Sequence, residues 1–295
     1  MGIAWGGCVE VRPGSHAVTD TAPSGGSPDA YFVPMLSPDE PDSDNNGGNS
    51  YSNNYLTDDY GTCPRQPTTC TRYDRRGRCT QTSKTPLAPA VAQARTCKYN
   101  GQTPTVSGSI GPNGNCRTKP ILPLSTDRAA IDSHIDSLVA AGSTNIGEGL
   151  IWGWRVISPS EPFVEGRPYN TPKNNKIIIL MTDGENTYYS ADNHNKSSYG
   201  AYGYAVKNRL GATYTDTALR ATMNTNLTQA CSNSKAAGIT VFTIAFRLES
   251  DPTTQSLLRS CANSTDKFFA ASNGTALISA FQQIAKQLNQ LRVAG

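Results

Sequence analysis

The acidic residue with the clearest chemical context in this sequence is Asp183. It follows the apolar run Ile177–Met181 and Thr182, and it precedes Gly184, in the phrase KIIILMTDGENT. In a parallel sheet covered by helices, the residue directly after a strand lies at the edge where ligands bind. Three roles are open for such a carboxylate: the first residue of an Asp-Gly turn, the nucleophile of a phosphatase, or an oxygen ligand for a hard cation.

The phosphatase alternative is weakened by a single position. Haloacid-dehalogenase-type phosphatases carry Asp-x-Asp-Gly-Thr at such a strand end, and the first of these aspartates is the nucleophile. In this chain the residue two positions before Asp183 is Met181. A Ser-His-Asp arrangement also lacks a nucleophile elbow, and His134 fits a helix surface better than a catalytic base. We therefore expect a protein that is not an enzyme, with a phosphatase-like hydrolase as the less favoured alternative.

Alternating strand and helix patterns from about Ser125 onward must position Asp183. Apolar and β-branched runs predict strands at 176–182, 239–246 and 267–271. Periodic apolar stripes predict helices at 125–142, 145–157, 215–237, 252–261 and 275–292. Asn145 and Glu148 have capping-box spacing, and Asp251 precedes a proline at a first helical position. This order is typical of an α/β fold with a doubly wound parallel sheet, and the unbroken apolar strands indicate helices on both faces.

Residues 1–124 differ in composition from the rest of the chain. They hold most of the 19 prolines and most of the eight cysteines, and 39–60 is rich in Asn, Asp, Ser and Gly. Such a segment cannot bury enough apolar surface to fold by itself. We therefore expect an irregular insertion region at 1–124 and a partial α/β domain at 125–295. Asp42 begins a pattern like the first half of an EF-hand loop, but Asn53 replaces the final glutamate, so we favour a solvated loop.

The cysteines indicate disulfides. Their count is even, their spacing is irregular and no C-x-x-C occurs, which favours disulfides in an oxidising compartment over a zinc site. Cys231 and Cys261 lie late on consecutive predicted helices with one strand between them, so we predict that they pair. The net charge is only +3, with both signs scattered, which gives no footprint for nucleic acid. Neither a membrane-spanning run nor a signal peptide is visible.

Two loops resemble the metal-binding loops of von Willebrand factor A (VWA) domains. STNIG at 143–147 resembles the threonine loop of these domains, and MTDG at 181–184 resembles their aspartate loop. The resemblance implies a metal-ion-dependent adhesion site, in which Thr144 supplies a hydroxyl to Mg²⁺ and Asp183 acts through a metal-bound water. It also implies that a carboxylate of a protein ligand completes the coordination.

Longer phrases are similar to one group of proteins that contain such a domain. STNIGEGLIWGWRVISPSEPF, KIIILMTDGENTYY, GITVFTIAF and FQQIAKQLNQLRV resemble the C-terminal half of TadG-type proteins of the tight-adherence (Flp) pilus. The resemblance covers nearly the whole chain and implies a role in pilus assembly or surface adhesion. It further implies partners in the pilus-assembly machinery and a place on the periplasmic side of the bacterial inner membrane, behind an N-terminal membrane helix. A general VWA adhesin is the alternative.

The chain departs from that family in one loop. VWA domains carry Asp-x-Ser-x-Ser after their first strand, and this motif does not occur at a strand end here. In the family sheet order 3-2-1-4-5-6, the predicted strands correspond to strands 4, 5 and 6. We therefore expect a partial VWA domain whose metal site, with Thr144 and Asp183, is incomplete. The missing strands and membrane helix would precede this chain in a longer protein or be lost from this lineage.

Overall fold

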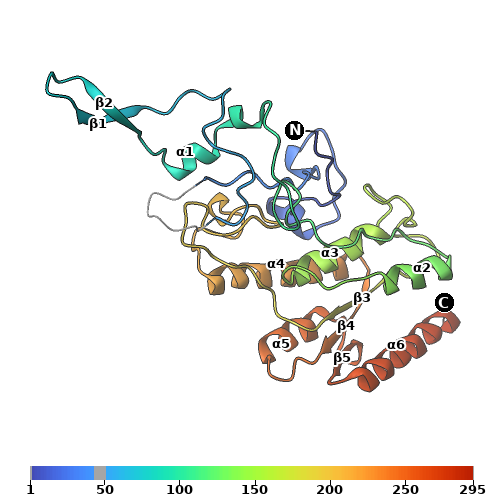
Figure 1. Cartoon of the computed structure of the whole chain (residues 1–295). Coiled ribbons are helices and arrows are strands. Elements are labelled where there is room, and N and C mark those ends of the chain that lie inside the picture. The colour runs from blue at the N-terminus through green and yellow to red at the C-terminus, as the bar shows by residue number, and fades with distance from the viewer. Residues whose placement is uncertain (1, 43–50, 295) are drawn as a thin grey trace. The chain divides into compact units, whose positions relative to one another are not determined.

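The computed structural model describes residues 2–42 and 51–294, which form two compact units (Figure 1). Unit 1 comprises Met1–Glu10, Pro34–Arg117 and Tyr189–Asn208. Unit 2 comprises Val11–Val33, Thr118–Tyr188 and Arg209–Gly295. Segments of the two units therefore alternate along the chain. Most of the EF-hand-like pattern that begins at Asp42 lies outside the described residues.

Unit 2 is built on a three-stranded parallel sheet with the strand order β3-β4-β5. The register pairs Ile177 with Thr240 and Thr243 with Phe268. The strands are β3 (Ile177–Thr182), β4 (Thr240–Phe246) and β5 (Phe268–Ala271). The helices are α2 (Arg128–Asp136), α3 (Ile146–Ile157), α4 (Asp216–Ala236), α5 (Pro252–Cys261) and α6 (Gly274–Ala294). The predicted α/β fold with a parallel sheet is confirmed.

The helices of unit 2 begin where side chains can accept the first free backbone N–H groups. Asn145 Oδ1 accepts a hydrogen bond from the Glu148 backbone N–H, so the capping residue predicted for α3 is in place. The Asp251 side chain caps α5 in the same way, one residue before Pro252. These local signals explain why the predicted starts of α3 and α5 agree with the structure.

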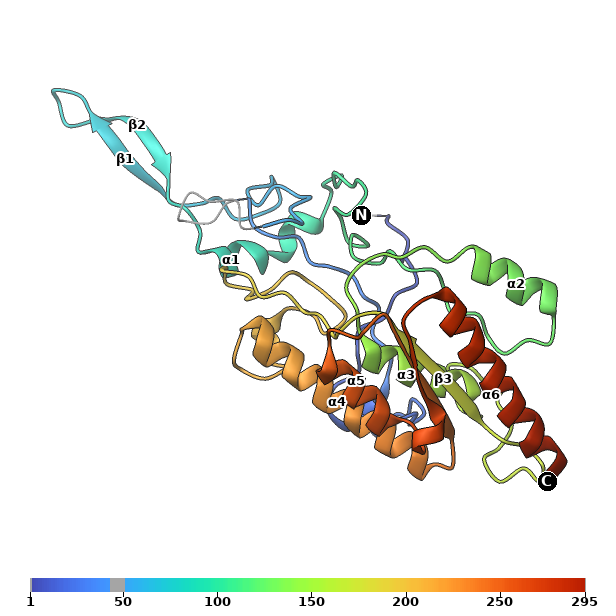
Figure 2. The same cartoon turned by 90° about the horizontal axis from the view of Figure 1, so that it is seen from below.

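Helices cover both faces of the sheet, as the two views show (Figures 1 and 2). Helices α3, α4 and α5 pack on one face, where Leu150, Leu227 and Leu258 meet Leu180 and Val241. Helix α6 covers the other face, where Ile284 packs against side chains of β4 and β5. The larger core of unit 2 therefore lies between the sheet and the three-helix layer.

Strand β3 is less covered than the sequence predicts. The alternate side chains Ile178 and Leu180 are buried against the three-helix layer. Ile179 and Met181 point to the face of α6 but remain 39% and 49% exposed. The reason is position: β3 is at the edge of the sheet, and α6 is centred on β4 and β5. The expectation of helices on both faces is therefore wrong for this strand.

Helix α2 is shorter than predicted. It ends at Asp136 instead of near Gly142, because the Ser137 backbone N–H and hydroxyl both donate to the His134 carbonyl and close the turn. The apolar face that the sequence predicts for this segment is not buried, since Ile135 and Leu138 are more than half exposed. Phe281 of α6, which the periodicity places on a buried face, is also exposed.

Unit 1 contains little regular structure and is cross-linked by disulfides. Its elements are the antiparallel hairpin β1 (Thr68–Tyr73) and β2 (Cys79–Lys84), the helix α1 (Pro89–Gln93) and the 3-10 helices η3 (Thr96–Tyr99) and η4 (Ala205–Lys207). Its disulfides are Cys8–Cys116, Cys63–Cys97 and Cys70–Cys79. The fourth disulfide, in unit 2, joins Cys231 and Cys261. The prediction that the cysteines are disulfide-bonded is confirmed, since none is free.

Within 2–42 and 51–294, no helix combines the length and the apolar character needed to cross a bilayer.

Candidate binding edge of the sheet

The candidate site lies where β3 ends. Thr182 is the last residue of the strand and is buried. Its hydroxyl donates to the Gly184 carbonyl at 2.9 Å and accepts from the Gly184 N–H at 3.2 Å, so the strand itself holds the turn that follows. Asp183, between these two residues, is exposed. The turn therefore presents the Asp183 side chain to solvent at the carboxyl edge of the parallel sheet.

The loop that carries Thr144 is joined to this turn. The Thr187 N–H donates to the Thr144 carbonyl at 2.9 Å, and the Ile146 N–H donates to Asn186 Oδ1 at 2.8 Å. A Cβ atom added to Gly184 would lie 3.6 Å from Thr144 Oγ1, so the threonine hydroxyl sits directly beside the residue that follows Asp183. The structure thus brings together the Thr144 loop and the Asp183 loop, the two loops singled out from the sequence.

A second layer of polar residues supports these loops and was not found from the sequence. Asn186 is buried, and its Nδ2 donates to Asn224 Oδ1 of α4 at 2.8 Å. Arg220, one turn earlier on α4, forms an ion pair with Glu185. The only sequence signal for Asn186 is its place three residues after Asp183. Nothing in the α4 periodicity distinguishes Asn224 or Arg220 from ordinary surface residues.

Charged residues of α3 are used in the interior of unit 2. Arg155 lies over the rings of Phe32 and Trp152, 5.2 and 4.6 Å from their centroids, and 3.8 Å from Glu148. Desolvation lowers the pKa of Arg155 to about 10, although the Glu148 carboxylate opposes this shift. Desolvation likewise raises the pKa of Glu148. The WGWR phrase therefore anchors residues 11–33 on α3.

Comparison with known families identifies the domain that these loops belong to. The family model described as von Willebrand factor type A domain matches residues 110–284, which is more than half of the chain. The chain belongs to the VWA domain family. Its Thr144 and Asp183 loops both fall within the matched range.

Comparisons with individual proteins add less. No significant match was found among curated proteins. Among solved structures, the crystal structure of the pilus adhesin SpaC from Lactobacillus rhamnosus GG matches with 19% identity and a TM-score of 0.37. The match covers 60% of this chain and 22% of the adhesin, so the chain spans under a quarter of that protein's length.

The donors at the VWA edge suit Mg²⁺ in kind but not in number. Hydroxyl and carboxylate oxygens are the ligands that Mg²⁺ prefers, and it requires near-octahedral coordination. Thr144 and Asp183 supply two such oxygens. Among the described residues, no group of three or more His, Cys, Asp or Glu side chains could hold a metal. These two residues therefore do not form a complete metal site by themselves.

The Cys231–Cys261 disulfide lies away from this edge of the VWA sheet. Asn263, two residues after Cys261, accepts from and donates to Val241 near the start of β4. The amino ends of parallel strands lie together at one edge of the sheet, and Asp183 lies at the other edge, where the strands end. This contact is therefore at the edge opposite Asp183. The disulfide therefore ties α4 to α5 and takes no part in the candidate site.

Proposed function

We propose that this chain is a non-enzymatic protein-binding module of the bacterial cell envelope, which binds its partner at the carboxyl edge of the VWA sheet. The observation that supports this most directly is the joined pair of loops with Thr144 and Asp183, inside the range that matches the VWA family. The finer proposal is that the chain acts as a TadG-type protein in assembly of the tight-adherence pilus, on the periplasmic side of the inner membrane.

The partner that this edge would accept is a protein with an exposed carboxylate, such as a component of the pilus-assembly machinery. A carboxylate that approaches Asp183 directly would be repelled by a like charge. A cation between the two groups would remove this repulsion, and the Thr144 hydroxyl, which lies beside Gly184, would help to hold it. We therefore include Mg²⁺ in the proposal, with further ligands supplied from outside the described residues.

Adhesion in the absence of a pilus role is the second candidate function. The VWA match supports adhesion as well as it supports pilus assembly. Membership of the family does not distinguish a module that assembles a pilus from one that attaches a cell to a surface. The SpaC title names a pilus adhesin, but the similarity is too weak to favour either candidate.

A single substitution in the encoding bacterium tests the proposal and separates the two candidates. Asp183→Ala should abolish the function while the protein stays at normal abundance. Loss of pili would support pilus assembly, and normal pili with reduced surface attachment would support adhesion. Asp266→Ala is the matched control, since Asp266 is an exposed carboxylate just before β5, at the opposite edge of the sheet. Unchanged pili and attachment in Asp183→Ala would overturn the proposed function.

A further inference from the structure

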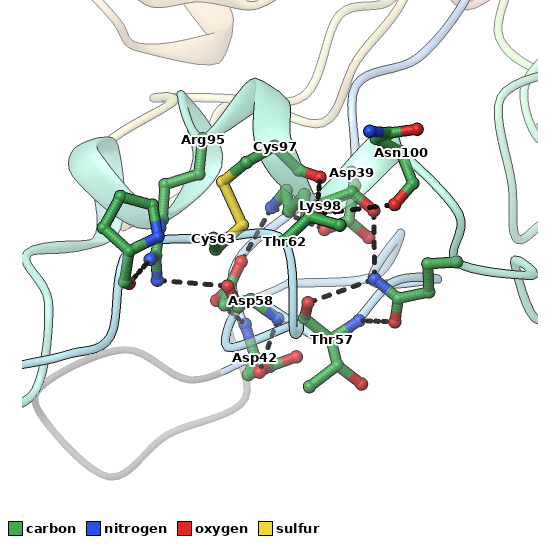
Figure 3. Close-up of a disulfide and its surroundings, with 12 residues drawn as sticks. Asp39, Asp42, Thr57, Asp58, Thr62, Cys63, Arg95, Cys97, Lys98 and Asn100 are labelled. Atoms are coloured by element: carbon green, nitrogen blue, oxygen red, sulfur yellow. Dashed lines mark hydrogen bonds and ion pairs between the residues drawn. A yellow bond between two sulfur atoms is a disulfide. The ribbon is translucent and has the colours of Figure 1, made fainter.

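A buried cluster of charged residues in unit 1 has no role in the proposed binding edge. Lys98 Nζ, on η3, lies 2.6 Å from Asp39 Oδ2 and 2.7 Å from Asp58 Oδ1 (Figure 3). The side chains of Lys98 and Asp39 are fully buried, and that of Asp58 is nearly so. An amine and a carboxyl group are thus held in contact where water is excluded.

The two oxygens of Asp39 have different surroundings. Oδ1 accepts hydrogen bonds from the backbone N–H groups of Tyr55 and Leu56, both at 2.7 Å. Oδ2 has no hydrogen-bond partner, although Lys98 Nζ is in contact with it. Two N–H groups on one oxygen are the arrangement that stabilises the oxyanion of an acyl-transfer intermediate. Oδ2 instead faces the Lys98 amine, so it is the oxygen that would leave.

Asp58 is oriented toward the amine. Its Oδ1 accepts a hydrogen bond from Lys98 Nζ, and its Oδ2 accepts from the Asp42 N–H at 2.8 Å. Lys98 is fixed by its neighbours, because Cys97 is disulfide-bonded to Cys63 and the Lys98 carbonyl accepts from Gln102. Asp58 is therefore placed to move protons to and from the amine (Figure 3).

The charges of the cluster favour a protonated Asp39. One ammonium and two carboxylates leave an excess negative charge in a buried place, which is costly. Desolvation raises the pKa of Asp39, and the Lys98 ammonium opposes this only in part. Desolvation lowers the pKa of Lys98, but the hydrogen bonds and the charges of Asp39 and Asp58 outweigh this effect. The pKa of Lys98 is therefore raised overall. A proton must therefore pass from Lys98 to Asp58 before the amine can react.

We propose that Lys98 and Asp39 condense to form an intramolecular isopeptide bond, with Asp58 as the proton relay. Asp58 accepts a proton from the Lys98 ammonium, and the neutral Nζ attacks Cγ of protonated Asp39. The Tyr55 and Leu56 N–H groups stabilise the negative charge that develops on Oδ1. The C–Oδ2 bond breaks as Asp58 returns a proton, and Oδ2 leaves as water. One proton stays on the amide nitrogen, and the last one remains on Asp58.

This bond would add a cross-link to unit 1 that reducing agents cannot break. It would join residues 39 and 98, and the closed loop would enclose the Cys63–Cys97 disulfide, which lies beside it in space and sequence. The segment 39–60, which is too polar to fold by itself, would then be attached covalently to η3. The proposal concerns unit 1 alone and stands or falls independently of the function proposed for the VWA edge.

The mass of the wild-type chain tests the proposal. Protein in which peptide mapping finds Cys63 paired with Cys97 is reduced, denatured and measured intact. We expect a mass lower than the sequence mass by one water. We also expect a branched tryptic peptide that contains both Asp39 and Lys98, because trypsin cannot cleave after an acylated lysine. The full sequence mass with cleavage after Lys98, in protein that carries this disulfide, would overturn the proposal.

Variants assign the roles within the cluster. Lys98→Arg keeps the positive charge but should restore the full sequence mass and remove the branched peptide. Asp58→Asn keeps the size of the side chain and both reacting groups, and should reduce the cross-linked fraction at least tenfold. Asp58→Glu, which can still relay protons, should recover cross-linking if Asp58→Asn disturbs folding. A fully cross-linked Asp58→Asn variant would overturn the relay role of Asp58.

Discussion

Unit 2 has a large apolar core that includes Leu150, Leu227 and Leu258. Unit 1 has only a small apolar cluster around Met35 and buries the polar side chains Asp39, Asn53 and Lys98. The apolar core of unit 2 is stabilised by burial, which is non-directional and tolerates small changes of shape. The buried polar groups of unit 1 depend on each donor meeting its acceptor, since a buried group that loses its partner retains the full cost of desolvation. The two units should therefore respond differently to substitution, to pH and to changes at their surfaces.

The largest effect is expected from Asp39→Ala in unit 1. The substitution leaves the Tyr55 and Leu56 N–H groups without an acceptor and removes one of the two carboxylates beside Lys98. Lys98 keeps Asp58 as its partner, so the cost comes from the two buried N–H groups, at about 1–3 kcal/mol for each donor left without an acceptor. Hydrogen exchange with mass spectrometry should show lost protection in 34–117 and unchanged protection in α4 and β4. Equal losses in both units would contradict the separation of their stabilising interactions.

The matching change in unit 2 is Leu150→Ala. Leu150 is fully buried between α3 and the sheet, and truncation of such a side chain leaves a cavity that costs about 3 kcal/mol. The same exchange experiment should now show reduced protection in α3, β3 and β4. Leu138→Ala, just after α2, serves as the control, because Leu138 is exposed and its truncation should change little.

A smaller effect is expected from pH through Glu148 in unit 2. Desolvation raises the pKa of Glu148 in the folded state, so its contribution is fully present below the ordinary glutamate pKa. That contribution is lost as pH rises through the raised value. We expect Glu148→Gln to remove this pH dependence, measured by chemical denaturation at several pH values. A wild-type stability that is flat, or that rises, over this window relative to Glu148→Gln would contradict the assignment.

The smallest effect on stability, but a clear effect on association, is expected at the free edge of β3. The hairpin of unit 1 presents charged residues such as Arg72 and Lys84, which discourage strand pairing between molecules, whereas β3 presents Ile179 and Met181. We expect the wild-type chain to self-associate. Ile179→Lys should reduce this association in light scattering and change stability by no more than about 0.5 kcal/mol. A wild-type chain that is strictly monomeric would show that its edge is protected.

Sequence patterns predict one unit far better than the other, for a physical reason. In unit 2, burial imposes a period on the sequence, and the caps Asn145 and Asp251 mark helix starts, so the strands and most helices could be located. The same patterns fail for α2 and for Ile179, because periodicity reports which face could be buried and not whether anything covers it. In unit 1, Asp39 and Lys98 are buried through hydrogen bonds between distant segments, and no local pattern encodes such partners.

The candidate site was predictable to the same extent. Asp183 could be named because it follows a strongly apolar strand, and Thr144 could be named because its loop resembles the threonine loop of VWA domains. Asn186 and Asn224 could not be predicted, because their role depends on a hydrogen bond between a loop and a helix that are far apart in the sequence.

The central claim is that Thr144 and Asp183 form the binding edge of this VWA domain, and amide chemical shifts during a Mg²⁺ titration test it most directly. With only Thr144 and Asp183 as protein ligands, the affinity for Mg²⁺ should be weak, in the millimolar range. We expect shift changes confined to the amides of 143–147 and 183–187, lost in Asp183→Ala and retained in Asp266→Ala. Sub-millimolar binding, shifts elsewhere in the chain, or an unchanged response in Asp183→Ala would contradict the account.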